Sequence, residues 1–391
     1  MRPIYLDYNA TTPIAPEVVD AMLPYLRQHF GNPSSAHPYG AAARDAVERS
    51  RQGLAAALNA PAEGIVFTSS GTESNNLAIE GVVRASANGR RHVITSSVEH
   101  PGVLEVVRWL ERQGGVRVSI LPVDEQGHVR PDDLERGIGP DTLLVSVMHA
   151  NNEVGTVQPI SSLAAIAHRH GALMHTDAAQ SVGKIPVDVA ALGVDLLTVV
   201  GHKVYAPKGV GALYVRPGVR IAPVLHGPGH EMGRRPGTEA VAQIAALAEA
   251  VRIATHHLDT EAPRQRALRD RLALGLRSEV GGARVRSNGD SDAGLPNTLS
   301  FSFRGVHADR LLASIASDVA ASAGSACHAH DVQLSPVLRA MGVAPEWAMG
   351  TLRLSLGRYT TPEDIEDAIR VIASGVRRVD AGECARVLRS A

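Results

Sequence analysis

The chain contains three lysines, Lys184, Lys203 and Lys208, among 39 basic residues, so few side chains could form a Schiff base with a carbonyl compound. Lys203 comes just after the apolar, β-branched run 196–200, and open α/β sheets bind ligands beyond the carboxyl ends of their strands. A lysine that loses hydration there gives up its proton more easily and becomes a nucleophile. Lys203 could instead be an exposed residue with its amine in solvent. Lys208 lies in a turn and is a weaker candidate, and Lys184 has no distinctive sequence context.

Two further segments could bind parts of the same ligand. Asp177 ends the apolar run 173–177, where its carboxylate could keep a pyridine nitrogen protonated, although it could equally be the N-cap of a following helix. The run 68–74 joins a predicted strand to a predicted helix, and its backbone N–H groups could bind a phosphate or simply begin a capped helix. An anion site, an aspartate and a lysine, in this order along the chain, indicate pyridoxal phosphate. The dinucleotide and triphosphate fingerprints GxGxxG and GxxxxGK[ST] are absent.

The elements that must position these residues alternate along the first part of the chain. Apolar runs predict strands at 65–69, 92–96, 117–122, 142–148, 173–177, 196–200 and 211–215. Helical patterns lie between them at 73–87, 101–112, 159–170 and 187–192. This alternation predicts an α/β fold with a large domain, in which a mostly parallel seven-stranded sheet is covered by helices.

The pattern changes after about residue 236 and predicts a smaller α+β domain. Beyond this point the sequence predicts helices at 238–257, 264–280, 308–317 and from residue 362, and strands at 299–303 and 352–356. We expect the large domain to span 15–256 and the small domain to combine 1–14 with 257–391. The segment 318–335 is rich in Ala, Ser and Gly around Cys327, which predicts a weakly held loop in the small domain.

Composition excludes several classes of protein. The formal net charge is −1 and aromatic residues make up 3%, which argues against direct nucleic-acid binding by bulk charge or base stacking. The two cysteines, Cys327 and Cys384, exclude a disulfide framework and fit a reducing compartment. The N-terminal residues show no secretory pattern, and the most apolar stretch, 241–253, is too short to span a bilayer. We therefore expect a cytoplasmic protein.

Ten short motifs, in order along nearly the whole chain, resemble those of the cysteine desulfurases of the NifS/IscS type. These enzymes belong to the class V aminotransferases, which are pyridoxal-phosphate enzymes of fold type I. The motifs lie at 5–12, 31–37, 72–78, 99–100, 151–155, 177–183, 201–203, 237–238, 324–327 and 353–357. The resemblance implies conversion of L-cysteine to L-alanine, with the sulfur left as a persulfide on Cys327 and then passed to a protein acceptor.

The resemblance also implies individual roles. Lys203 would form the Schiff base with pyridoxal 5'-phosphate and move the substrate's Cα proton, and His100 would stack on the cofactor ring and act in acid–base steps. The other cofactor-binding residues it implies are Gly71, Thr72, Asn152, Asp177, Gln180, His202 and Thr238. Thr238 would reach the phosphate of a partner subunit, which implies a homodimer. The substrate-binding residues it implies are Arg353, Asn152 and Asn32.

Cys327 distinguishes a desulfurase from an ordinary aminotransferase, because transamination needs no thiol. A cysteine in such a segment could also be an inert small hydrophobe, and Cys384 has no context that indicates a function. His328 and His330 follow the cysteine where the family usually has Ser or Thr; they could lower the pKa of the thiol, and they lack the spacing of a structural zinc site, so no metal is expected. The stretch 319–323 is compatible with β-structure, so the loop could be shorter and better ordered than in the family.

One departure concerns the phosphate site: Val200 stands where the family often has a hydroxyl residue, and Thr198 could compensate for it. The alternatives to a cysteine desulfurase are a selenocysteine lyase or a small-molecule aminotransferase of the same fold, and an accessory subunit that has lost catalysis. The sulfur acceptor could serve iron–sulfur assembly, tRNA thiolation or DNA phosphorothioation.

Overall fold

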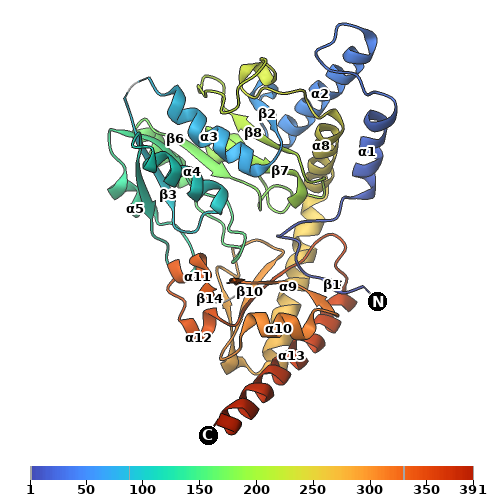
Figure 1. Cartoon of the computed structure of the whole chain (residues 1–391), viewed down its shortest axis with the longest axis vertical. Coiled ribbons are helices and arrows are strands. Elements are labelled where there is room, and N and C mark those ends of the chain that lie inside the picture. The colour runs from blue at the N-terminus through green and yellow to red at the C-terminus, as the bar shows by residue number, and fades with distance from the viewer. Residues whose placement is uncertain (1, 88, 329–330, 391) are drawn as a thin grey trace.

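The computed structural model describes residues 2–87, 89–328 and 331–390, and within 325–328, 331–333 and 381–390 the description is of the backbone. Figure 1 shows a large sheet with its helices in the upper part of the molecule and a smaller sheet with a long C-terminal helix in the lower part. The helix coloured yellow to orange connects the two parts and runs down beside the smaller sheet (Figure 1).

The large sheet of the described chain has seven strands in the order β2-β8-β7-β6-β5-β3-β4. Their bounds are β2 (Ile65–Thr68), β3 (His92–Ser96), β4 (Arg117–Leu121), β5 (Thr142–Ser146), β6 (Leu173–Asp177), β7 (Leu196–Val200) and β8 (Gly211–Val215). Strands β7, β6, β5, β3 and β4 pair in parallel, whereas β8 is antiparallel to both of its neighbours. The predicted mostly parallel seven-stranded sheet is therefore confirmed, with strand ends that differ by up to two residues.

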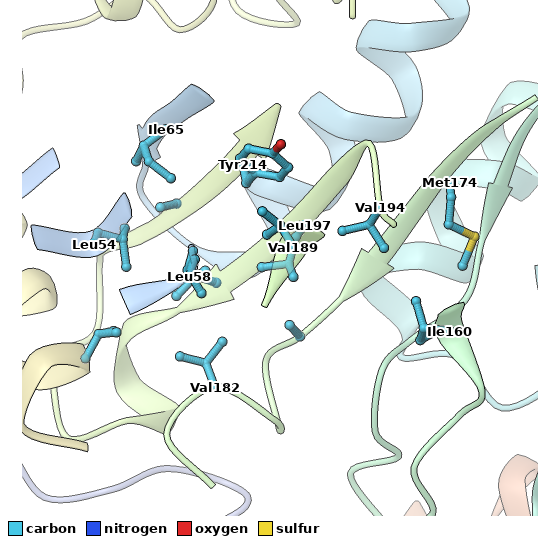
Figure 2. Close-up of a cluster of buried hydrophobic side chains, with 14 of the residues drawn as sticks. Leu54, Leu58, Ile65, Ile160, Met174, Val182, Val189, Val194, Leu197 and Tyr214 are labelled. Atoms are coloured by element: carbon cyan, nitrogen blue, oxygen red, sulfur yellow. The ribbon is translucent and has the colours of Figure 1, made fainter. Parts of the chain in front are cut away.

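Helices cover both faces of this sheet, which explains why its central strands are continuous apolar runs. The helices of this part are α1 (Pro16–Arg27), α2 (Pro38–Ala57), α3 (Gly71–Ala85), α4 (Pro101–Arg112), α5 (Pro131–Gly137), α6 (Ile160–Arg169), α7 (Val189–Leu192) and α8 (Val241–His256). One apolar core joins residues of α2, α6 and α8 to the sheet, and a second joins α3 and α4 to it. Figure 2 shows part of the first core, in which Leu54 and Leu58 lie near Ile65, Leu197 and Tyr214 of the strands.

A second, antiparallel sheet of the described residues has the order β12-β15-β10-β9. Its strands are β9 (Val285–Asn288), β10 (Thr298–Phe303), β12 (Ser322–Ala323) and β15 (Thr351–Ser355). Helices α9 (Leu258–Val280), α10 (Ala308–Ile315) and α13 (Pro362–Ser390) pack on it around Phe301 and Phe303, and the short α11 (Pro336–Ala340) and α12 (Pro345–Ala348) precede β15. The N-terminal β1 (Ile4–Tyr5) pairs in parallel with β11 (Val319–Ala320). The N-terminal segment therefore packs with the smaller, C-terminal part of the molecule.

The segment 318–335 is not the loop that its composition predicted. It contains β11, β12 and a hairpin of β13 (Ser325–His328) with β14 (Asp331–Leu334), in which Cys327 is paired with Val332. The expected β-structure at 319–323 is thus confirmed. Ala, Ser and Gly have weak strand preferences of their own, and pairing with β1 and β15 supplies the hydrogen-bond partners that local sequence does not show.

A buried ion pair attaches the connection between β8 and α8 to helix α2. Glu231 accepts hydrogen bonds from Arg51 Nη1 and Nη2 at 2.9 and 3.0 Å and from the backbone N–H of Phe67 at 2.8 Å. Its backbone φ of +47° is rare for a residue with a side chain, so the contacts must hold it in place. This connection also carries Arg235 and Thr238.

We expect Glu231→Ala to lower the free energy of unfolding by about 3–5 kcal/mol, because it leaves the Arg51 charge buried without its main partner. Glu48→Ala is the matched control: Glu48 also contacts Arg51, but its side chain is 54% exposed, against 1% for Glu231. Its loss should cost less than about 1 kcal/mol. Urea denaturation of the variants at one protein concentration measures both values, and equal losses would contradict the role given to Glu231.

Candidate active site

A cavity opens at the carboxyl ends of the central strands, the place where α/β sheets bind ligands. It is lined by Asn9, Ala10, Ser70, Gly71, Thr72, Asn75, His100, Met148, Ala150, Asn152, Asp177, Ala179, Gln180, Val200, His202, Lys203 and Arg353. The structure thus brings together nine residues singled out in the sequence analysis. They are Gly71, Thr72, His100, Asn152, Asp177, Gln180, His202, Lys203 and Arg353.

The N-terminus of α3 forms an anion cradle at one side of the cavity. Ser70 is the N-cap, and its Oγ accepts the N–H of Glu73 at 3.1 Å. The N–H groups of Gly71 and Thr72 lie in the first turn, where no intrahelical acceptor exists. A Cβ on Gly71 would lie 2.3 Å from Val200 Cγ2, so this position requires glycine. The carboxylate of Glu73 binds Ser69 and Arg235 and does not line the cavity.

His202 contributes a neutral imidazole near this cradle. Burial first, and then the charges of Lys203 and Lys208, lower its pKa to about 4. Its Nδ1 lies 3.2 Å from Thr11 Oγ1. Thr198 does not take the place of a hydroxyl residue at position 200, because it is fully buried, its Oγ1 contacts His175 Nε2, and it does not line the cavity.

Asp177 is a buried carboxylate at the end of β6. Its Oδ1 accepts the backbone N–H of Ala179 at 2.9 Å, and its Oδ2 accepts Asn75 Nδ2 at 2.7 Å. Both interpretations of the sequence are thus partly met, since Asp177 caps the following turn and also lines the cavity. Asn75 Oδ1 has no hydrogen-bond partner within the described chain. Asn75, which the sequence analysis did not single out, therefore holds the carboxylate in place.

Lys203 lies in the short 3-10 turn that follows β7, and its Nζ donates to the carbonyl oxygens of Asn9 and Ala10 at 2.6 and 2.8 Å. Burial lowers its pKa to about 8; the charge of Arg353 acts in the same direction, and Asp7 and Asp177 oppose it. An appreciable fraction of this amine is therefore unprotonated near neutral pH, which suits a nucleophile or a base. Lys208, by contrast, is exposed.

His100 is the N-cap of α4 at the rim of the cavity. Its Nδ1 accepts the N–H of Gly102 at 3.0 Å, so the neutral ring carries its proton on Nε2. Loss of hydration lowers its pKa most, with Asp177 acting to raise it and Lys203 to lower it. The ring is partly exposed at the rim of the cavity, so its loss of hydration is only partial.

Arg353 enters the cavity from β15 of the smaller sheet. Its Nη2 donates to Asp7 Oδ1 at 2.7 Å and to Ser322 Oγ at 3.0 Å, and its Nη1 donates to the carbonyl oxygen of Asn152 at 3.3 Å. Its Nε is buried and has no partner in the described chain. The guanidinium is thus fixed in place and retains a free donor, which suits recognition of a carboxylate.

The other residues predicted for the site lie away from the cavity or outside the description. Asn32 is exposed, and its Oδ1 accepts the N–H of Ser34 at 2.9 Å. Thr238 is also exposed and does not line the cavity. Cys327 is placed by its backbone in β13, whereas the side chains of Cys327 and His328, and all of His330, lie outside the described residues.

Lys184, which has no distinctive sequence context, does not line the cavity but contacts two residues that do. Its Nζ donates to Gln180 Oε1 at 2.6 Å and to Asn9 Oδ1 at 3.0 Å. The signal that the sequence offered was weak: Lys184 is four residues after Gln180 and directly follows the family-like motif 177–183. Nothing local pointed to Asn9, which is more than 170 residues earlier in the chain.

No cluster of three or more His, Cys, Asp or Glu side chains within the described part of the chain could hold a metal ion. No helix in that part of the chain is both long enough and apolar enough to cross a membrane.

Comparisons with known proteins agree with the geometry of the cavity. Residues 4–367 match the family described as Aminotransferase class-V. A protein named Cysteine desulfurase IscS from Dictyoglomus turgidum is 45% identical over 372 residues, which are 95% of this chain and 94% of that protein. A solved NifS-like protein superposes with a TM-score of 0.89 at 37% identity, covering 96% of this chain and 99% of that one. A structure titled SspA in complex with cysteine has a TM-score of 0.78 at 36% identity, covering 92% and 100%.

These matches extend over almost the whole chain, and they agree with a cavity that combines a lysine of lowered pKa, a buried aspartate and a helix N-terminus. The chain belongs to the class-V aminotransferase family, among its cysteine desulfurases.

Proposed function

We propose that this protein binds pyridoxal 5'-phosphate in the cavity and converts L-cysteine to L-alanine, leaving the sulfur as a persulfide on Cys327. The observation that carries the proposal is the position of Lys203, whose amine has a lowered pKa and shares one cavity with Asp177 and the N-terminus of α3. The SspA structure with cysteine, at 36% identity, supports the same substrate.

The donor set of the cavity fits this cofactor. The N–H groups of Gly71 and Thr72, together with His202, would bind the phosphate, Asp177 would pair with the ring nitrogen, and Gln180 would face the ring oxygen. When bound, pyridoxal phosphate supplies an electron-withdrawing ring that stabilises negative charge at the substrate Cα. His100 at the rim would stack on the ring, and Thr238 of a second subunit would complete the phosphate site in a homodimer.

The residues of the chain then perform three tasks. Arg353 and Asn152 bind the substrate carboxylate, with Asn32 assigned to the same region by resemblance alone. Lys203 takes the Cα proton with its unprotonated amine, and His100 serves in further proton transfers. The Cys327 thiolate attacks the substrate sulfur; the carbon–sulfur bond breaks, its electron pair stays with carbon and is protonated, and L-alanine and a Cys327 persulfide result.

The division of the chain into two domains fits this assignment. We propose that 15–256 binds the cofactor, and that 1–14 with 257–391 contributes Arg353 and the hairpin that carries Cys327. A reducing compartment such as the cytoplasm would keep the Cys327 thiol free from oxidation to a disulfide, and we propose this location. The protein acceptor of the sulfur is the partner that the proposal requires, in iron–sulfur assembly, tRNA thiolation or DNA phosphorothioation.

The test is to incubate purified protein with pyridoxal phosphate, L-cysteine and a reducing thiol, and to measure alanine and sulfide together with keto acids. A desulfurase produces alanine and sulfide in equal amounts. An aminotransferase would produce a keto acid without sulfide, and a subunit without catalysis would bind the cofactor and form none of these products. Either result would overturn the proposal. Selenocysteine as a competing substrate would identify a lyase by preferred release of selenide.

A further inference from the structure

Lys184 is half-buried, and its amine contacts groups that belong to the cavity although it does not line the cavity itself. Its Nζ donates to Gln180 Oε1 at 2.6 Å and to Asn9 Oδ1 at 3.0 Å. Burial lowers its pKa well below the usual value, and the charges of Lys203 and Arg353 add to this effect. In the charged or the neutral form the amine has enough N–H groups for both bonds. The Lys184 amine loses hydration in this position, so we expect its two hydrogen bonds to have a structural role.

The first role of Lys184 is to orient the Gln180 amide. An amide has one oxygen and one NH2 group, and its neighbours decide which of them faces where. Lys184 donates to Oε1, while Nε2 donates to the carbonyl oxygen of Asn9 at 3.0 Å. The second N–H of Nε2 is then left for the cavity, which Gln180 lines. The amide is fixed from both ends and offers a donor.

The second role of Lys184 is to hold Asn9, which is almost completely buried. Its Oδ1 accepts from Lys184 and also from Asn297 Nδ2 at 3.1 Å, and its Nδ2 donates to Thr298 Oγ1 at 2.8 Å. The carbonyl oxygen of Asn9 accepts both Gln180 Nε2 and, at 2.6 Å, Lys203 Nζ. Two of the three lysines of the chain therefore meet on one residue, which also connects to β10 of the smaller sheet.

We propose that Lys184 is a positioning residue that makes Gln180 present an N–H to the ring oxygen of the cofactor and holds the Asn9 carbonyl that orients the Lys203 amine. The identity of the ligand rests on the proposed function; the hydrogen bonds do not. An N–H donor stabilises the ionised ring oxygen most when the Lys203 nitrogen has lost its proton. A positive charge on Lys184 acts in the same direction, so the charge state of Lys184 does not alter the expected sign.

The test is a pH titration of the visible absorbance of the reconstituted protein, which reports the protonation of the Lys203 nitrogen linked to the cofactor. In Lys184→Met we expect the apparent pKa to rise by about one pH unit, with an increase of about tenfold in the dissociation constant of pyridoxal phosphate. Lys208→Met is the matched control, because it makes the same substitution at an exposed lysine. The titration of this variant should stay close to that of the unaltered protein. Thermal unfolding of the apoproteins shows whether each variant is folded.

A double-mutant cycle with Gln180→Leu separates positioning from a simple charge effect. If Lys184 acts through Gln180, Lys184→Met adds little to the shift already caused by Gln180→Leu. Additive shifts would overturn the proposed action through Gln180, and a Lys184→Met protein that is folded and titrates like Lys208→Met would overturn the whole proposal. An unaltered protein that acquires no visible band would overturn the proposed function, and with it this inference; a normal band with an unshifted Lys184→Met would overturn this inference alone.

Discussion

Lys203→Ala should abolish the stable visible absorbance of the reconstituted protein and reduce the turnover of L-cysteine by at least ~10³-fold. In the proposed mechanism the substitution removes both the amine that links to the cofactor and the base that takes the Cα proton, and each of these contributes a large factor to rate. Dialysis against buffer without pyridoxal phosphate, followed by absorbance and sulfide assays, measures both effects. Lys208→Ala removes an exposed lysine five residues later and should retain colour and turnover.

The lowered pKa of Lys203 adds a pH dependence to this prediction. The free amine attacks the aldehyde of pyridoxal phosphate, and the pKa of about 8 means that its fraction rises with pH up to about that value and then levels off. Stopped-flow mixing of apoprotein with cofactor should therefore show a capture rate that increases about tenfold per pH unit well below pH 8. A rate that continues to rise towards pH 10 would show that the pKa of the Lys203 amine is not lowered in this cavity.

Cys327→Ser should retain the absorbance of the bound cofactor and the spectral change on addition of L-cysteine, yet lose the release of sulfide and alanine. A hydroxyl is a far weaker nucleophile than a thiolate near neutral pH, so sulfur transfer should fall by about 10³-fold or more. Mass spectrometry of the unaltered protein after L-cysteine, without reductant, should find one additional sulfur atom on the peptide that contains Cys327.

The chain provides its own control for this experiment, because its second cysteine, Cys384, lies near the C-terminus in α13. Cys384→Ser should form the persulfide and release sulfide at the normal rate. Normal sulfide release by Cys327→Ser would show that Cys327 is not the nucleophile. Loss of release in both variants would instead indicate a requirement for two thiols.

The large sheet could be predicted from the sequence because its strands, apart from the edge strand β4, are buried on both faces. Such strands are unbroken apolar runs, and β3, β6, β7 and β8 begin and end where the runs do. The runs also located Lys203 and Asp177, since residues that follow parallel strands gather at one edge of the sheet. The α3 cradle was visible for a similar local reason, as a short polar sequence between a strand and a helix.

Contacts between segments that are far apart in the chain could not be predicted from these local patterns. The hairpin at Cys327 was predicted as a loop, because pairing partners rather than residue preferences make its strands. The sequence likewise showed Arg353 but not its bond to Asp7, which lies 346 residues earlier in the chain.

The sequence by itself thus determined the α/β class and indicated that Lys203, Asp177 and the run 68–74 share one edge of the sheet, because burial and strand direction follow from local patterns; the other predicted site residues came from the family resemblance. Only the tertiary structure decided how Asn9 and Lys184 hold Gln180 and Lys203, since a hydrogen bond between segments far apart in the chain leaves no period or motif in either of them.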